Sequence, residues 1–133
     1  MAPTILFLCP HGAAKSILAA AYFEQAAAQH DLKLHVEAAG TEPDPAVSPV
    51  VAGWLAQEGL APWANRTPRL VRAEEIGRAW RVVSLGCDLD HLVPTGTIID
   101  HWDNVPAPSQ HLRAACDLIR HHVAQLIAEL RHE

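Results

Sequence analysis

The sequence predicts an α/β fold, a single three-layer domain over residues 1–133 with a four-stranded parallel sheet and helices on both faces. Three observations predict it. Short apolar runs of strand-forming residues alternate along the chain with longer helical segments. The last helical segment carries apolar residues at three- and four-residue steps, as an amphipathic helix does. A chain of 133 residues that is 50% hydrophobic can also bury a sizeable core.

The elements follow in a regular order. A continuous apolar run from Ile5 to Leu8 predicts a buried strand, and an alanine-rich segment that begins near Ser16 predicts the first helix. The same alternation then repeats to the end of the chain. Predicted strands are residues 4–8, 34–38, 81–85 and 97–100, and predicted helices are residues 14–30, 45–58, 73–79 and 109–131.

Two helix ends carry explicit signals. Gly59 is expected to end the second helix, and Pro62 is expected to prevent that helix from resuming. Ser109, which follows Pro108, is expected to cap the N-terminus of the last helix. The apolar face of that helix is predicted to be Leu112, Ala115, Cys116, Ile119, Val123, Leu126, Ile127 and Leu130, with His111, His121, His122 and His132 on the solvated side.

Composition narrows the function classes. The formal net charge of −5 argues against a general nucleic-acid binder, and the chain has no apolar run of the roughly 18 to 20 residues that a membrane span needs. We therefore expect a cytoplasmic protein with neither nucleic-acid nor membrane partners. One local basic stretch, residues 66–72, is interpreted either as a solvated loop and helix start or as a border of an anion site.

The loop between the first strand and the first helix is the most informative segment. It begins at Cys9 and ends at Lys15 and Ser16. Free backbone N–H groups and the dipole at a helix N-terminus attract anions, and the same field, with the ammonium of Lys15, favours the thiolate form of Cys9. The predicted anion-binding residues are Pro10, His11, Gly12, Ala13, Ala14, Lys15 and Ser16.

Four motifs follow one another along residues 4–131. They are the loop Cys-x5-Lys-Ser from Cys9, Ala-Ala-Gly-Thr-Glu-Pro at 38–43, Val-Val-Ser-Leu-Gly-Cys at 82–87, and His-Trp-Asp at 101–103. Together they resemble the low-molecular-weight protein tyrosine phosphatases and the arsenate reductases built on that fold. A histidine at the third position of the loop, here His11, resembles the arsenate reductases more closely than the phosphatases.

The resemblance implies a chemistry. Cys9 would attack phosphorus or arsenic and form a covalent thiol-phosphoryl or thiol-arseno intermediate, while Lys15, Ser16 and the loop amides hold the oxygens. The substrate would be phosphate, a phosphoprotein or arsenate, and both branches stay open at this point. We expect no metal and no cofactor, with an external thiol reductant as the one open addition.

The chain departs from the family pattern in three places. Lys15 stands where the family has arginine, so the charge is kept but the bidentate grip on oxygens is lost. Gly12 replaces an asparagine that braces the loop. Ala107 occupies the position of the general-acid aspartate, and Asp103 is interpreted either as a substitute acid or as a residue that braces the turn. These departures motivate a rival hypothesis, a catalytically impaired oxyanion-binding or regulatory protein.

Cys116 and Cys87 are interpreted differently from Cys9. Cys116 lies on the apolar face of the last helix and is predicted to be a buried structural thiol. Cys87 matches the first resolving cysteine of the reductases, so it is either a redox partner of Cys9 or an inert loop residue. His91 stands where the resemblance expects the next cysteine, so a three-cysteine relay is absent. An external thiol, from a thioredoxin or a low-molecular-weight thiol system, would then complete a reductase cycle.

A third hypothesis comes from a different class. Cys9, His11, Cys87, His91 and His101 would converge at one sheet edge, and sulfur with imidazole suits zinc. The spacings are weak signals, so metal binding is the minor alternative. Trp102 adjoins the same edge, where it either packs in the core or walls the site.

Overall fold

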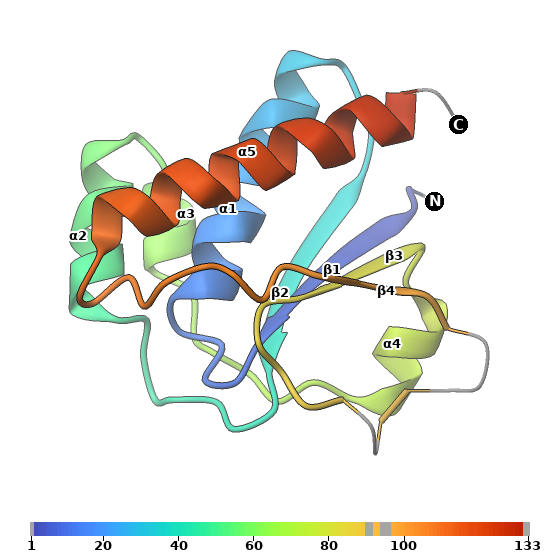
Figure 1. Cartoon of the computed structure of the whole chain (residues 1–133), viewed down its shortest axis with the longest axis horizontal. Coiled ribbons are helices and arrows are strands. Elements are labelled where there is room, and N and C mark those ends of the chain that lie inside the picture. Colours follow the sequence, from blue (N-terminus) through green and yellow to red (C-terminus); the bar gives the residue numbers. More distant parts are fainter. Residues whose placement is uncertain (1, 90–91, 94–96, 132–133) are drawn as a thin grey trace.

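The apolar run near the N-terminus forms the centre of a parallel sheet. The computed structural model describes residues 2–89, 92–93 and 97–131. The strand order is β2-β1-β3-β4, and every paired neighbour is parallel. All four strands therefore end at the same edge of the sheet (Figure 1). The strands are β1 (Thr4–Cys9), β2 (His35–Gly40), β3 (Arg81–Ser84) and β4 (Ile99–His101).

Helices cover both faces of this sheet, so the three-layer α/β prediction is confirmed (Figure 1). Ile5 and Phe7 of β1 pack into a large cluster with four of the helices, α1, α2, α3 and α5. Leu6 and Leu8 alternate to the other face, where they pack with Ile76 of α4. The helices are α1 (Lys15–Gln29), α2 (Pro49–Gln57), α3 (Ala61–Ala64), α4 (Ala73–Arg78) and α5 (Leu112–Arg131).

The second predicted helix differs from the structure at both ends. Helix α2 begins at Pro49 rather than at residue 45, because the segment before it runs along the loop that follows β1.

The prediction that Pro62 prevents a new helical turn is wrong. Pro62 lies in the first turn of α3, where a helix tolerates a missing N–H, and this turn buries Trp63.

The start of the last helix is also corrected. Ser109 does not cap α5, because the carbonyl of Ala107 accepts from the N–H groups of Gln110 and His111 and forms a separate turn. Helix α5 begins at Leu112. The predicted apolar face is confirmed, since all its members from Ala115 onward are buried and Leu112 packs against the core.

One histidine of that helix is not solvated as predicted. His122 is half-buried and its ring stacks on Trp102, whereas His111 and His121 are exposed. His132 lies outside the described residues. Within the described part of the chain, no helix is long and apolar enough to cross a membrane.

The basic stretch at residues 66–72 forms an ion-paired edge beside β2. Arg69 binds Glu37 and Glu75, and Arg66 lies 4.0 Å from Glu37. The hydrogen bond with Arg69 lowers the pKa of Glu75, and the Glu75 carboxylate in turn raises the pKa of Arg69. Carboxylates thus compensate this stretch, as expected for a structural loop rather than for an anion site.

Candidate active site

Cys9 ends the central strand, at the edge of the sheet where helix α1 begins. Its side chain is 4% exposed. The Cys9 thiol donates to Ser16 Oγ at 3.1 Å, and the backbone N–H of Ser16 donates to Cys9 Sγ at 3.4 Å. When the thiol ionises, the Ser16 hydroxyl can turn and donate to the sulfur, so both contacts can stabilise a thiolate.

The loop between Cys9 and α1 is held from outside through its carbonyl groups. The carbonyls of Pro10, His11 and Ala13 accept from the backbone N–H groups of residues 42, 44 and 48. In a trans peptide the C=O and the following N–H point in opposite directions, and no described peptide bond is cis. The N–H groups of residues 11, 12 and 14 therefore point away from segment 42–48.

These inner N–H groups have the character of an anion cradle. Among the described residues, none of the N–H groups of residues 11–14 has a hydrogen-bond partner. Gly12 and Ala13 are buried, and buried N–H groups are normally paired. Helix α1 adds its own N-terminus, whose cap residue Ala14 provides no side-chain acceptor within the described structure.

Two glycines allow this loop to lie against β2. Gly12 has φ +61°, a left-handed conformation that favours glycine. A Cβ atom at Gly40 would lie 2.6 Å from the Gly12 nitrogen and 2.9 Å from the carbonyl oxygens of Cys9 and Pro10. The sequence flagged residues 38–43 by resemblance only, and the structure supplies the reason, which is backbone contact.

Lys15 begins α1 and is half-buried. In the described part of the chain no carboxylate forms an ion pair with it. Burial and then the charge of Cys9 raise the pKa of Cys87, and the Lys15 charge opposes this rise, so the ammonium lies within electrostatic range of this thiol. Lys15 is thus a cation at the end of the loop with no ion-pair partner among the described residues.

Cys87 lies near Cys9 but does not bond to it. Both thiols are free. Ser84 orients the turn, since its Oγ accepts from the Cys87 N–H at 3.1 Å, and the Thr41 side chain lies beside the Cys87 thiol. Burial, and then the neighbouring charge of Cys9, raise the pKa of Cys87 to about 12, and Cys87 is therefore a protonated thiol near neutral pH. Sequence reasoning missed Thr41 and Ser84 as its partners.

Cys116 is a core thiol, as predicted. It is 1% exposed and lies beside the hydroxyl of Tyr22 on α1. Trp54 Nε1 donates to the same hydroxyl at 2.6 Å. Cys116 thus belongs to a contact between helices and is separate from the loop.

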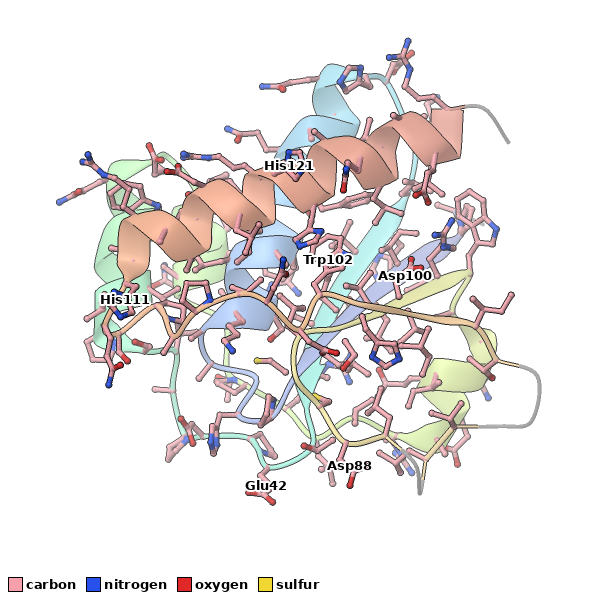
Figure 2. The ribbon with its side chains drawn as sticks, viewed as in Figure 1. Glu42, Asp88, Asp100, Trp102, His111 and His121 are labelled. Atoms are coloured by element: carbon pink, nitrogen blue, oxygen red, sulfur yellow. The ribbon has the colours of Figure 1, made fainter. Side chains whose placement is uncertain are left out.

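The two positions considered for a general acid, Asp103 and Ala107, lie beyond the end of β4. Asp103 is exposed, and its carboxylate lies 4.0 Å from Nδ1 of His101. No hydrogen bond joins Asp103 to Cys9 among the described residues, so the role of Asp103 stays a prediction. Ala107 is exposed at the turn before α5 and offers no proton. Trp102 is buried between the sheet and α5, as a packing residue (Figure 2).

The loop after β2 contacts the side chain of His11. His11 Nδ1 lies 3.2 Å from the carbonyl oxygen of Glu42 and 3.3 Å from Asp44 Oδ1. Figure 2 shows Glu42 and Asp88 on the loops that follow β2 and β3. His11 therefore joins the loop of residues 10–14 to segment 42–48 by a side-chain contact that the sequence did not predict.

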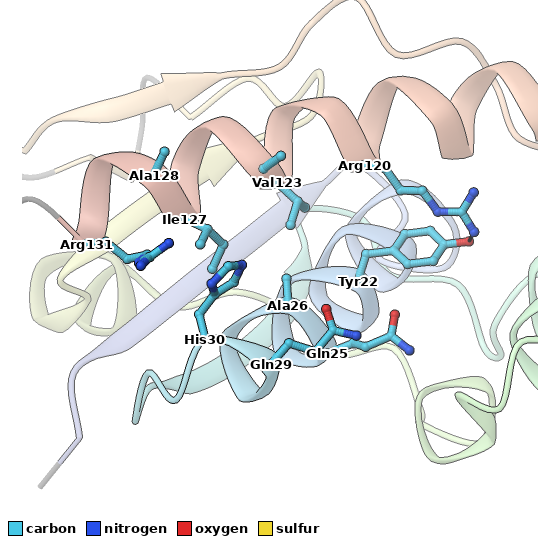
Figure 3. Close-up of a pocket in the computed structure, with 11 residues that line it drawn as sticks. Tyr22, Gln25, Ala26, Gln29, His30, Arg120, Val123, Ile127, Ala128 and Arg131 are labelled. Carbon is cyan, nitrogen blue, oxygen red and sulfur yellow. Dashed lines mark hydrogen bonds between the residues drawn. The ribbon is translucent and has the colours of Figure 1, made fainter.

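A groove elsewhere on the molecule is distinct from this site, and the metal-site hypothesis can be tested as well. A groove between α1 and α5 is lined by residues such as Tyr22, Arg120 and Ile127 and includes none of the predicted site residues (Figure 3). Over residues 2–89, 92–93 and 97–131, no group of three His, Cys, Asp or Glu side chains is arranged to hold a metal ion. His91 lies outside that range, and the hypothesis of a Cys/His metal site gains no support.

Comparison with solved structures agrees with this architecture. A protein tyrosine phosphatase from Entamoeba histolytica has 17% identity and a TM-score of 0.87, with 98% of each chain covered. An arsenate reductase from Archaeoglobus fulgidus has 26% identity and a TM-score of 0.72, over 93% of this chain and 98% of that one. A thioredoxin-dependent arsenate reductase from Corynebacterium glutamicum has 22% identity and a TM-score of 0.79. The match covers 98% of this chain and 62% of the Corynebacterium protein.

The sequence comparisons give the family directly. No curated protein matches the chain. Residues 4–133 match the sequence model of the low molecular weight phosphotyrosine protein phosphatase family, and this match spans nearly the whole chain. The chain, with its cysteine loop at the carboxyl edge of a parallel sheet, therefore belongs to the low molecular weight phosphotyrosine protein phosphatase family.

Proposed function

We propose that this protein is an oxyanion-processing cysteine enzyme in which Cys9 is the nucleophile. The observation that carries the proposal is the pairing of Cys9 with Ser16, which lie at the two ends of the loop. The inner N–H groups of this loop have no hydrogen-bond partner among the described residues. A thiol and several N–H donors lie together there, and phosphoryl or arsenyl transfer uses a sulfur nucleophile beside donors to the oxygens.

With a phosphate ester, the Cys9 thiolate attacks phosphorus, and the alcohol leaves with a proton. Water then attacks the thiol-phosphoryl bond and releases phosphate together with the free thiol. Lys15 and the loop amides hold the oxygens in both steps. Asp103 is the candidate proton donor, since it lies beyond the end of β4 at the same edge of the sheet.

With arsenate, the Cys9 sulfur bonds to arsenic as one oxygen leaves as water. A second thiol then attacks the Cys9 sulfur and forms a disulfide with it, and the second thiol loses its proton. The bond between sulfur and arsenic breaks, and its electron pair leaves with arsenic, which is reduced from As(V) to As(III). That thiol is either Cys87 or an external thiol such as thioredoxin, on which the Corynebacterium relative depends. A reducing compartment such as the cytoplasm would return both sulfurs to thiols.

A specific observation favours a second candidate, an oxyanion-binding regulatory protein with little turnover. Ala107 is exposed and carries no acid group, and Lys15 cannot make the bidentate grip of arginine. Positioned acid catalysis is worth roughly 10²- to 10⁴-fold, so this loss would leave a slow phosphatase whose anion cradle still binds.

One comparison separates the two candidates. Hydrolysis of para-nitrophenyl phosphate and thiol-dependent arsenate reduction are measured in the wild type, in Cys9→Ser and in Cys116→Ser. The enzyme proposal expects turnover in the wild type and in Cys116→Ser and none in Cys9→Ser. Equal rates in the wild type and Cys9→Ser, with inorganic phosphate still bound in calorimetry, would favour the regulatory protein.

A further inference from the structure

An aromatic column connects α5 to the strand that carries Cys9. The rings of Phe23 and Phe7 have centroids 5.5 Å apart, and those of Phe7 and Trp102 are 5.6 Å apart. The His122 ring stacks on the outer side of Trp102, with centroids 4.8 Å apart and an interplanar angle of 11°. The column therefore passes through α1, β1, the segment after β4, and α5.

Each inner ring of the column adjoins a part of the candidate site. Phe7 precedes Cys9 by two residues, so both side chains lie on the same face of β1. Trp102 immediately precedes Asp103, and its backbone N–H donates to the carbonyl of Ser84 at 2.8 Å. The ring of Trp102 thus fixes where the chain leaves the sheet just before the candidate acid.

His122 holds this segment at two points. Its ring covers the face of Trp102, and its Nε2 lies 2.9 Å from Oδ1 of Asn104, within hydrogen-bond distance. Asp103 lies between these two anchored residues. Its own side chain is exposed and meets only His101 at 4.0 Å among the described charged groups, so little else fixes it locally.

We propose that His122 is a positioning residue for the reaction at Cys9, because it holds Trp102 and Asn104 and so sets the place of Asp103 at the carboxyl edge of the sheet. This inference rests on the proposed function. His122 does not touch the reacting atoms and acts only through the segment of residues 102–104.

The charges around His122 make its protonation a usable signal. His121 neighbours it on α5, and a small hollow beside it is lined by Glu129 of α5 and by Asp100 and His101 of β4. Arg81 of β3 binds both Asp100 and Glu129. Burial, and then the charge of His121, lower the pKa of His122, so the imidazole is neutral near pH 7.

The first readout is the fluorescence of Trp102. A protonated imidazole stacked on an indole quenches its fluorescence, so the wild type should dim as the pH falls below the ordinary histidine range near 6.5. The change should be lost in both His122→Phe and Trp102→Phe and kept in His121→Ala. A change that persists in His122→Phe would overturn the stacking that the inference requires.

The second readout separates positioning from a merely structural role. In His122→Ala and in Asn104→Ala we expect kcat for para-nitrophenyl phosphate to fall about 10- to 100-fold, because small misplacement of a reacting group is costly. The inhibition constant of inorganic phosphate should not change, since the loop of residues 10–16 is untouched. His121→Ala, an exposed neighbour, should match the wild type in both quantities.

The outcomes are distinguishable. If the wild type has no Cys9-dependent turnover, the proposed function fails, and the catalytic role of His122 fails with it. If the wild type turns over and kcat is unchanged in His122→Ala and Asn104→Ala, only this inference is overturned. Loss of folding in His122→Ala is detected by urea unfolding. In that case kcat is measured in His122→Phe, which keeps an aromatic ring on Trp102 but cannot bond to Asn104, and a kcat equal to that of the wild type would overturn the inference.

Discussion

Gly40 and Gly12 are in backbone contact, since a Cβ atom at Gly40 would lie only 2.6 Å from the Gly12 nitrogen. Gly40 pairs with Cys9 in the parallel register of β1 and β2, so this contact lies beside the candidate nucleophile. The last residue of β2 therefore supports the anion loop through its lack of a side chain.

Gly40→Ala should destabilise the protein and weaken the loop. Backbone atoms that cannot swing aside surround the new methyl group, so we expect a loss of about 1–3 kcal/mol in the free energy of unfolding, with weaker binding of inorganic phosphate. Urea unfolding and calorimetry measure the two effects. Gly53→Ala in α2 is the matched control. Its Cβ would meet no atom within 4 Å, so its stability should rise slightly. Equal behaviour of the two variants would contradict the contact.

Ser16→Ala should make Cys9 less reactive. The Ser16 hydroxyl lies 3.1 Å from the sulfur and can donate to the thiolate, and a hydrogen bond to a charged group contributes about 1.5–3 kcal/mol. We expect alkylation of Cys9 by iodoacetamide at pH 7 to slow about tenfold or more, as followed by mass spectrometry. Ser16→Thr keeps the hydroxyl and should retain most of the rate. An unchanged rate in Ser16→Ala would show that the hydroxyl does not stabilise the thiolate.

Cys87 should become more reactive when Cys9 is replaced. Burial and the charge of Cys9 raise the pKa of Cys87 to about 12, so in the wild type Cys87 should resist alkylation until the solution is strongly alkaline. In Cys9→Ser one cause of that shift is removed, and alkylation of Cys87 at pH 9 should be faster. Lys15→Gln should have the opposite effect, because the Lys15 charge lowers the pKa of Cys87. Identical Cys87 rates in all three proteins would mean that the thiols do not interact.

The double variant Lys15→Arg with Ala107→Asp tests whether the loop is a reduced version of the family site. A bidentate donor and a positioned acid would be restored, and acid catalysis alone is worth roughly 10²- to 10⁴-fold. Hydrolysis of para-nitrophenyl phosphate should rise by orders of magnitude, with the single variants as controls. If activity falls instead, the lysine loop is adapted to a different ligand.

The protein should lose stability in alkaline solution partly through Tyr22. Burial raises the pKa of Tyr22 from 10.0 to about 12, so the unfolded state releases its proton first. The stabilising contribution is complete below pH 10 and is lost as the pH rises toward 12, and it amounts to roughly 2 kcal/mol over that range. Unfolding by urea at several pH values should therefore show a flatter decline in Tyr22→Phe. A parallel decline in both proteins would exclude this cause.

The sequence by itself determined the α/β class, the four strands, the apolar face of the last helix, and the loop from Cys9 to Ser16. These follow from local periodicity and from the spacing of chemical groups along one short segment, so no knowledge of distant residues is needed. The sequence analysis does not predict the helical turn at Ala61–Ala64, because it interprets Pro62 as a residue that stops a helix. A proline in the first turn of a helix, however, leaves no hydrogen bond unmade.

Only the tertiary structure decided which residues far apart in sequence meet. Examples are the contact of Gly40 with Gly12, the placement of Thr41 beside Cys87, and the stacking of His122 on Trp102. Such contacts depend on the order and register of the strands, which place β2 and β3 on either side of β1. A histidine on the polar side of a helical pattern is therefore half-buried here, because the segment after β4 brings an indole ring against it.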